Sequence, residues 1–266
     1  MNERRIKEHL RDKVDEWIKT LPVELRRDVL TNCFVTGGSI VSLLLGEAVN
    51  DYDIYFTKEE TALRVALHYA KDKVAEITSA PGTVNISVRS SGIWLNTSRE
   101  LKSHEPKCIK PYEPMCITGN AISLSDKVQL ITKFVGTPNE VHKNFDFVHC
   151  MCYYEPFGDN LVVPVDAAIS MMTKELKYRG SLYPLASIIR TRKFIKRGWS
   201  INAGQYLKMI LQLQGLNLYD LNVLKDQLIG VDSLYFHQML LQVGDLHVKD
   251  GQVDALYLVE LIDRFF

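Results

Sequence analysis

The sequence has 266 residues, 46% of them hydrophobic and 24% charged, a globular composition that excludes a disordered tail, a collagen-like fibre or a disulfide miniprotein. Lys and Arg balance Asp and Glu at 32 each, so no overall positive charge indicates nucleic-acid binding, although a local basic patch is compatible with this balance. No apolar run of membrane-spanning length or signal-peptide character occurs, and the five cysteines lack a disulfide-framework spacing, so we expect a cytoplasmic protein with reduced thiols.

The first 76 residues alternate between helical and strand patterns. Ile6, Leu10, Val14 and Ile18 recur every four residues, which predicts an amphipathic helix over 2–20. The other elements predicted in this part are a helix over 23–31, a strand over 33–36, a helix over 39–45 ended by Gly46, a strand over 51–56 and a helix over 58–76.

The middle of the chain is rich in β-prone runs, and the end is helical. The predicted strands cover 84–88, 93–96, 116–124, 128–134 and 145–153, with a short helix over 137–143. Helices are predicted near 166–178, 182–198, 202–214, 220–228, 232–243 and 252–265. We therefore expect an α/β domain over 1–165, which includes N-terminal helices within 2–31, and a helical domain over 166–266, with a hinge near 160–166.

A short turn and two acidic residues form the most informative motif. Gly37, Gly38 and Ser39 lie between a predicted strand and a predicted helix, where glycine lets the backbone approach a phosphate and the helix start offers unpaired N–H groups. Asp51 and Asp53 then occupy alternate positions of a strand, so their carboxylates share one face. Two like charges at that spacing favour a divalent cation between them, and carboxylate oxygens suit Mg²⁺.

These residues resemble the signature of the nucleotidyltransferase superfamily typified by DNA polymerase β, which combines Gly-Gly/Ser, a helical turn and Asp-x-Asp. The resemblance implies a mixed sheet flanked by helices, followed by a helical C-terminal region. It also implies two Mg²⁺ ions, or Mn²⁺ in their place, held by Asp51 and Asp53, with the β- and γ-phosphates of a nucleoside triphosphate against Gly37, Gly38 and Ser39. An ordinary turn followed by strand-capping aspartates is the alternative interpretation.

The same resemblance implies a third metal-binding carboxylate on a neighbouring strand. Asp146 is the best candidate, because it lies between two aromatic residues on a β-prone run and would face away from them. Its alternative is a solvent-exposed aspartate on an edge strand. Asp126 and Asp166 are rivals, but Asp126 suits a hairpin turn beside Ser125, and Asp166 suits the N-cap of the next helix.

A narrower likeness is to the tRNA CCA-adding enzymes and bacterial poly(A) polymerases. The segments 144–147 and 189–199 keep a rhythm similar to the Arg-Asp-Phe motif and the later arginine-rich helix of those enzymes. The arginine pair before the aspartate and a Glu-Asp-x-x-Arg motif are both absent, so the likeness implies the superfamily without CCA specificity. It points to a divergent member of the kind found in phage and mobile-element genomes.

Several residues of the helical part are candidates for nucleotide binding. Arg190, Lys193 and Arg197 fall on one side of the helix predicted over 182–198, opposite Ile188, Ile195 and Trp199, so a basic stripe could contact the triphosphate or a nucleic-acid backbone. Lys174 and Tyr178, four apart on the preceding predicted helix, share a face. Related template-independent polymerases use a Lys and a Tyr here for phosphate binding and base stacking. A solvated helix face is the alternative for both sets.

The expected activity is transfer of a nucleoside monophosphate from a nucleoside triphosphate to a hydroxyl, with release of pyrophosphate. An RNA 3′ end, tRNA above all, is the first choice of acceptor. A protein or a small molecule such as an antibiotic is the alternative, which the acidic segment 216–266, with eight acids and three Lys or Arg, leaves open. A third possibility is a catalytically inactive nucleotide-binding module, against which the intact Asp51 and Asp53 argue.

Overall fold

The computed structural model describes residues 2–88, 93–94, 110–228, 248–249, 252–253, 259–260 and 262–263. They form two compact units, one of Met1–Lys143 with Cys150–Val165, the other of Asn144–His149 with Asp166–Phe266. The assignment of 1–165 as a catalytic domain and 166–266 as a helical domain stays a prediction, and residues 144–149 pack with the second unit.

The first unit is built on an eight-stranded mixed sheet with the order β10-β9-β1-β2-β8-β7-β6-β5. Neighbouring strands are antiparallel except β2 and β8, which run parallel. The strands are β1 Cys33–Thr36, β2 Tyr52–Phe56, β5 Ile93–Trp94, β6 Pro114–Ile117, β7 Ala121–Leu124, β8 Val128–Val135, β9 Tyr153–Glu155 and β10 Asn160–Val162.

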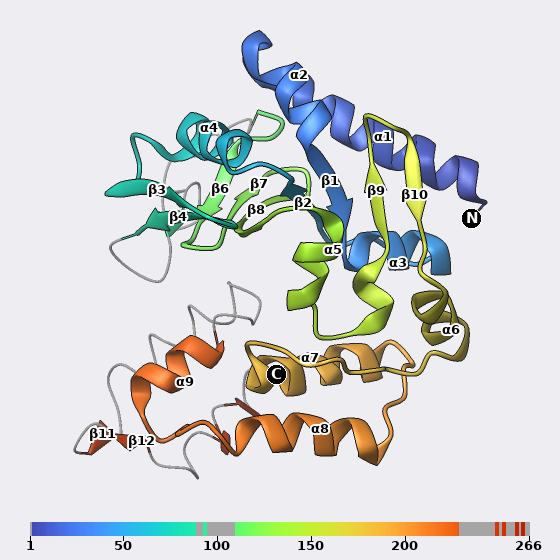
Figure 1. Ribbon diagram of the computed structural model, residues 1–266, viewed down its shortest axis with the longest axis vertical. Helices are drawn as coiled ribbons and strands as arrows, with labels where there is room; N and C mark the ends of the chain where they lie inside the picture. The colour runs from blue at the N-terminus through green and yellow to red at the C-terminus, as the bar shows by residue number, and fades with distance from the viewer. Residues whose placement is uncertain are drawn as a thin grey trace, which may run out of the picture. The chain divides into compact units, whose positions relative to one another are not determined.

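Three helices pack together against this sheet (Figure 1). They are α1 Glu3–Thr20, α2 Val23–Asn32 and α4 Glu59–Ala70. Trp17 Nε1 donates to Tyr69 Oη at 3.1 Å between α1 and α4, and Arg64 pairs with Asp28 at 3.0 Å between α4 and α2. The predicted stripe of α1 is confirmed, because Ile6, Leu10, Val14 and Ile18 are buried together with Trp17.

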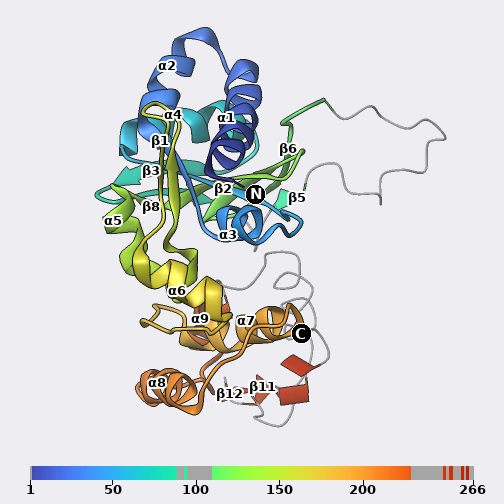
Figure 2. The same ribbon diagram turned by 90° about the vertical axis from the view of Figure 1, so that its right-hand side faces the viewer.

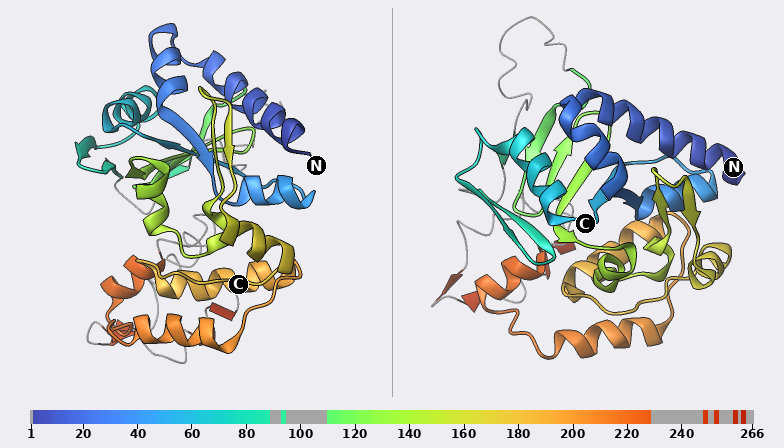
Figure 3. Two further views of the ribbon diagram at one scale, coloured as in Figure 1. Left: turned by 45° about the vertical axis from the view of Figure 1, so that its right-hand side comes forward. Right: turned by 45° about the horizontal axis from the view of Figure 1, so that its top comes forward.

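Strand β1 lies in the interior of the sheet, between β2 and β9 (Figure 3). All four of its residues are buried, as expected for a short apolar strand covered on both faces. Its last residue, Thr36, is paired with Asp53 of β2 on one side and with Tyr153 of β9 on the other. The centre of the sheet therefore fixes the position at which the chain leaves β1.

Two predicted elements of the first unit are wrong in detail. The helix predicted over 58–76 ends at Ala70, and Glu76–Ala80 forms strand β3, which pairs with β4, Thr83–Ser87, in a separate hairpin. The single strand predicted over 116–124 is a hairpin of β6 and β7, because the hydroxyl of Thr118 accepts from the amides of Asn120 and Ala121 and turns the chain. The Gly119-Asn120 pair inside the predicted strand is the signal of this turn.

The second unit is helical. It contains α6 Val165–Thr173, α7 Pro184–Lys196, α8 Ala203–Leu213 and α9 Leu221–Leu228, and α7 packs beside α8 (Figure 2). The helix predicted over 166–178 is too long by five residues, for a reason given below. The helix predicted over 232–243 lies outside the described residues, and the segment predicted as a helix over 252–265 begins with a strand, β12 Gln252–Val253, paired with β11 Val248–Lys249.

The predicted fold class is confirmed. A mixed sheet flanked by helices is followed in the chain by a helical region. In the part of the chain that the structure describes, no helix has both the length and the hydropathy needed to cross a membrane.

Candidate functional site

The turn at Gly37 touches the carboxylate of Asp53. Gly37 has a φ of +91°, and a Cβ added to it would lie 3.1 Å from Asp53 Oδ2. The close approach follows from the register, since Thr36 is paired with Asp53 and the next residue turns over that strand. Only glycine combines this backbone conformation with so short a distance. The predicted glycine turn and the predicted aspartate are therefore neighbours in the structure.

Gly37 also caps the helix α3, Gly38–Leu45, which ends at Gly46 in the left-handed conformation as predicted. The first turn of this helix has N–H groups without intrahelical partners and the positive end of the helix dipole. Ser39 in that turn is 2% exposed, and its Oγ has no hydrogen-bond partner among the described residues. A buried hydroxyl of this kind normally has a partner, so the start of α3 is suited to an anionic group.

The strand alternation directs Asp53 away from α1. Tyr52 Oη and His9 Nε2 of α1 are 2.6 Å apart, which places the Tyr52 side chain on the face that α1 covers, and Asp53 on the opposite face. Asp51, one residue before β2, is exposed, and Asp53 is half-buried. Among the described residues, no group of three or more His, Cys, Asp and Glu side chains could hold a metal ion. A cation at Asp51 and Asp53 would thus take further oxygen ligands from a substrate or from water.

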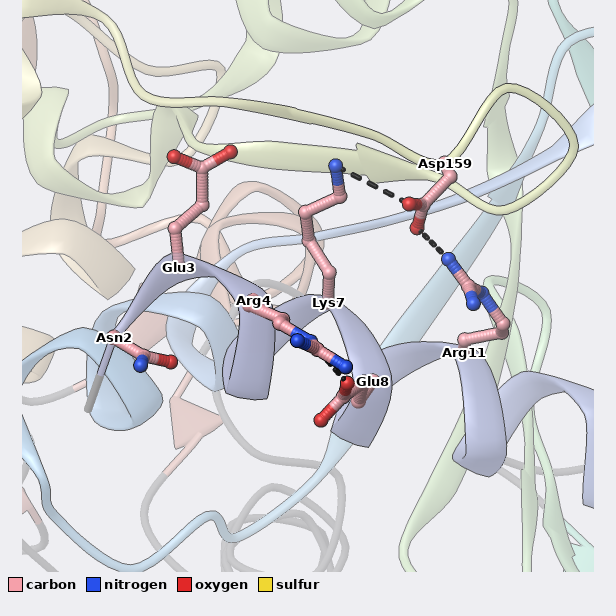
Figure 4. A pocket seen from close by; sticks show the side chains of 7 residues that line it. All are labelled: Asn2, Glu3, Arg4, Lys7, Glu8, Arg11 and Asp159. Carbon is pink, nitrogen blue, oxygen red and sulfur yellow. Dashed lines mark hydrogen bonds and ion pairs between the residues drawn. The ribbon is translucent and has the colours of Figure 1, made fainter.

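A hollow beside α1 is lined by charged residues but does not contain the predicted site. Asp159, in the turn between β9 and β10, pairs with Lys7 at 3.2 Å and with Arg11, and Arg4 pairs with Glu8 at 2.9 Å (Figure 4). The hydrogen bond from Arg11 is the main reason that the pKa of Asp159 falls to about 2. Because these charges satisfy one another, they act to hold the β9–β10 hairpin on α1.

Asp146 lies in the second unit, and the strand predicted around it is wrong. Residues Val148–Met151 form a 3₁₀ helix, and the preceding segment bridges to another chain segment through Phe147 and Tyr178. The carboxylate of Asp146 is buried, 3.0 Å from Arg190 Nη1, and accepts a hydrogen bond from Ser187 Oγ at 3.0 Å. The role of Asp146 as a third metal ligand stays a prediction.

Its rival Asp126 lies in a turn as expected, where its carboxylate accepts hydrogen bonds from Ser125 Oγ and Tyr112 N.

Lys174 and Tyr178 do not share a helical face as predicted. Helix α6 ends at Thr173, because Lys174 has a φ of +48° and the amide of Glu175 returns to Ser170 O. Lys174 Nζ lies 3.5 Å from Arg197 O.

Tyr178 is buried, and burial raises its pKa to about 12. Its amide donates to Gln205 Oε1, and its hydroxyl donates to Gln212. The contact of Lys174 and Tyr178 with a nucleotide stays a prediction.

The basic stripe predicted on α7 is divided. Arg190 faces inward to Asp146, whereas Lys193 is exposed and Arg197 lies after the last helical residue, where it caps the helix. The predicted apolar side is wrong for Ile195, which is 46% exposed, because α7 instead buries Leu185, Ala186 and Ile189. The exposed basic residues at the end of α7 are Arg192, Lys193 and Lys196. Phosphate binding by Arg190, Lys193 and Arg197 stays a prediction.

Two residues beside the Gly37 turn, Thr36 and His142, have no local signal in the sequence. The Thr36 hydroxyl is 2.8 Å from His142 Nε2 and donates to Cys152 O at 2.7 Å, and both Thr36 and His142 are buried. More than one hundred residues separate them in the chain, so no local pattern can reveal the pair.

A comparison with protein-family models matches residues 8–174, well over half of the chain, to the Gabija anti-defense 2 family, Gad2. The chain belongs to the Gabija anti-defense 2 family. The matched region includes Gly37, Gly38, Ser39, Asp51 and Asp53. A curated member, "Gabija anti-defense 2" of Bacillus phage SPbetaL7, is 21% identical over 232 residues, which cover 86% of this chain and 47% of the relative. The chain spans about half the length of this curated relative.

Solved structures that resemble this member of the Gad2 family include CCA-adding enzymes. One, from Thermotoga maritima complexed with tRNA, is 14% identical, covers 87% of this chain and 54% of that chain, and has a TM-score of 0.42. Another, from Bacillus stearothermophilus in complex with CTP, is 14% identical, covers 79% and 47%, and has a TM-score of 0.40.

Proposed function

We propose that this chain is a metal-dependent nucleotidyltransferase that moves a nucleoside monophosphate from a nucleoside triphosphate to an acceptor hydroxyl and releases pyrophosphate. The contact of the Gly37 turn with Asp53 is the observation that carries the proposal. It brings a site suited to phosphate, at the start of α3, to within a few ångströms of a carboxylate suited to a divalent cation. A phosphate and its cation have to meet in this way for phosphoryl transfer.

The five motif residues of the first unit each have a proposed role. Gly37 and Gly38 admit the β- and γ-phosphates close to the backbone, and Ser39 Oγ donates to a phosphate oxygen. Asp51 and Asp53 bind Mg²⁺, or Mn²⁺, through their oxygens. The bound ions would lower the pKa of the acceptor hydroxyl and offset the negative charge that develops on pyrophosphate. The residue types present fit such ions, since the Asp53 carboxylate lies beside the Gly37 turn and Asp51 comes two residues before it in the chain.

The acceptor that we propose is an RNA 3′ end, with tRNA first. The end of α7 supports it, because its exposed side chains include Arg192, Lys193 and Lys196 with no acidic residue between them, which suits a polyanion. Because the family is described as Gabija anti-defense 2, we propose that the transfer acts against the Gabija defence. The contributions of Asp146, Lys174, Tyr178, Arg190, Lys193 and Arg197 stay predictions within this proposal.

A labelling survey tests the proposal. The purified protein is incubated with Mg²⁺ and each α-³²P nucleoside triphosphate, together with total RNA or an extract of cells that carry the Gabija system. Label on RNA of tRNA size, dependent on Asp53, is the expected result. Label on a protein or a small molecule would replace the RNA acceptor with the alternative substrate class, and nucleotide binding without label would indicate an inactive module.

A further inference from the structure

The end of β1 is held by a buried hydrogen-bond cluster that the proposed chemistry does not use. Thr36, the residue before Gly37, is 0% exposed, and its hydroxyl lies between His142 Nε2 and the carbonyl oxygen of Cys152. His142 is 3% exposed. Burial of these three polar groups, the Thr36 hydroxyl, the His142 imidazole and the Cys152 carbonyl, would cost free energy if they were unpaired. Here they form hydrogen bonds with one another.

The directions of these bonds follow from counting protons. The Thr36 hydroxyl has one proton, which it donates to Cys152 O at 2.7 Å. Thr36 Oγ1 is then the acceptor at the 2.8 Å contact with His142, so His142 carries its proton on Nε2. Removing either the hydroxyl or the imidazole leaves a buried donor or acceptor without its partner.

His142 is itself fixed by a short rigid segment. It follows α5, Pro138–Val141, which begins with a reciprocal pair of hydrogen bonds between Thr137 and Glu140. Glu140 packs so closely on Gly136 that a Cβ there would lie 2.9 Å from Glu140 Oε2. Gly136 directly follows β8, and β8 pairs with β2. Asp53 on β2 is thus linked to His142 through β8 and α5. His142 in turn contacts Thr36, which is paired with Asp53 on the neighbouring strand.

We infer that His142 is a positioning residue, which acts through Thr36 to fix the Gly37 turn and the start of α3 for the triphosphate. The inference rests on the proposed function. Thr36 is the covalent neighbour of Gly37, and Gly37 has a positive φ and little space against Asp53. A shift of the Thr36 backbone is therefore transmitted directly to the groups proposed to bind phosphate. His142 itself contacts no substrate in this account.

The test compares variants that remove the hydrogen bond with variants that keep it. Thr36→Val and His142→Phe remove it, whereas Thr36→Ser keeps the hydroxyl and His142→Gln keeps a donor of similar reach. His68→Phe, on α4, is the matched control for replacing a histidine ring. Hydrogen exchange is measured on the peptide over residues 33–41, with the β3–β4 hairpin as the internal reference, and KM and kcat are measured for the nucleotide.

Loss of positioning should accelerate exchange over 33–41 about tenfold, with no change in the β3–β4 hairpin. It should also raise the KM for the nucleotide about tenfold and change kcat less, since loss of one hydrogen bond weakens binding of the substrate and of the transition state alike. Thr36→Ser, His142→Gln and His68→Phe should stay close to wild type. The double variant of Thr36→Val and His142→Phe should be no worse than either single variant, because both remove the same bond.

The exchange experiment does not need activity, so it separates the two proposals. Accelerated exchange in Thr36→Val and His142→Phe supports the positioning role even if the wild type transfers no nucleotide, in which case the proposed function fails alone. Unchanged exchange and unchanged KM in both variants, with wild-type transfer intact, would overturn the positioning role and leave the proposed function standing.

Discussion

Gly37 and Asp53 meet at the end of β1, where a Cβ on Gly37 would lie 3.1 Å from Asp53 Oδ2. The contact joins the two halves of a sequence motif that are separated by a helix and a loop. Three glycines of this region allow the causes of a Gly→Ala effect to be separated. Gly37 has both a positive φ and the close carboxylate, Gly46 has a positive φ in open space, and Gly38 has neither.

Gly37→Ala is therefore expected to reduce nucleotide binding most. The left-handed conformation of Gly46 costs an alanine about 1–2 kcal/mol. Gly37, with a φ of 91° and a ψ of −151°, lies in a region that almost only glycine adopts, so an alanine there costs up to about 3 kcal/mol. Gly37→Ala alone also displaces the Asp53 carboxylate. Urea unfolding and titration with a nonhydrolysable nucleotide should show a loss of stability at both positions, larger at 37, with lost binding only at 37. Gly46→Ala is the control for a positive φ outside the site, and equal binding by Gly37→Ala and Gly46→Ala would contradict the site.

Asp146 and Arg190 are expected to stabilise the second unit as a pair. The carboxylate is buried and accepts from both Arg190 and Ser187, so Arg190→Gln leaves it without its charged partner. Since the Arg190 side chain is 36% exposed, we expect a loss of about 2 kcal/mol in the free energy of unfolding. Arg192→Gln on the exposed side of α7 is the control. Asp146→Asn combined with Arg190→Gln should cost less than the sum of the two single changes, and strict additivity would argue against the pair.

The pH dependence of the second unit should reflect His149. The ring is fully buried, with centroid distances of 4.3 Å to Trp199 and 4.7 Å to Phe194, and burial, aided by the charge of Arg197, lowers its pKa from 6.5 to about 3. The unfolded chain therefore binds a proton at a higher pH than the folded one. The stability that this neutral ring contributes is complete above pH 6.5 and is lost as the pH falls toward 3.

His149→Phe removes the titrating group while keeping a ring in the cluster. Between pH 7 and pH 3.5 the wild type should lose about 4 kcal/mol more of its free energy of unfolding than this variant, an upper figure for a single group. Urea titrations at several pH values measure the difference. Parallel curves for the two proteins would show that His149 does not titrate in this range.

The charged hollow beside α1 gives a prediction that is independent of function. The pKa of Asp159 is lowered to about 2, first by the hydrogen bond from Arg11 and then by those from Tyr154 and Lys7. Arg11→Gln should raise this pKa toward its ordinary value of about 3.8, as followed by the carboxyl resonance in an NMR titration. Arg4→Gln, whose partner is Glu8, should leave it unchanged. An Asp159 pKa that does not respond to Arg11→Gln would contradict the pairing.

Local sequence patterns predicted the elements around the site well. The four-residue spacing of α1, the apolar run of β1, the glycines that begin and end α3, and the alternation of β2 are all signals within a few residues. The bulky residues around Asp146 predict a strand, but Phe147 and His149 instead pack in an aromatic cluster with Phe194 and Trp199. That packing depends on residues some fifty positions away, which local patterns do not contain.

Local sequence patterns also do not predict some helix ends or the pairs of residues that are distant in the chain. Helix α6 stops at Lys174 through a left-handed residue that is not glycine, so the usual stop signal is missing. Helical geometry alone predicts an exposed stripe that includes Arg190, because it carries no information about Asp146, with which Arg190 pairs on the inner side of α7. The Thr36–His142 pair has no signal at all in a single sequence.

The central claim is that Asp53 binds the metal ion for nucleotide transfer. The most direct test is transfer of label from α-³²P nucleoside triphosphates by wild type, Asp53→Asn and the exposed control Asp72→Asn, with Mg²⁺ and with EDTA in its place. The account predicts label in the wild type and Asp72→Asn only with Mg²⁺, and a loss of at least about a thousandfold in Asp53→Asn at unchanged stability. Transfer by Asp53→Asn at the wild-type rate, or transfer in EDTA, would contradict it.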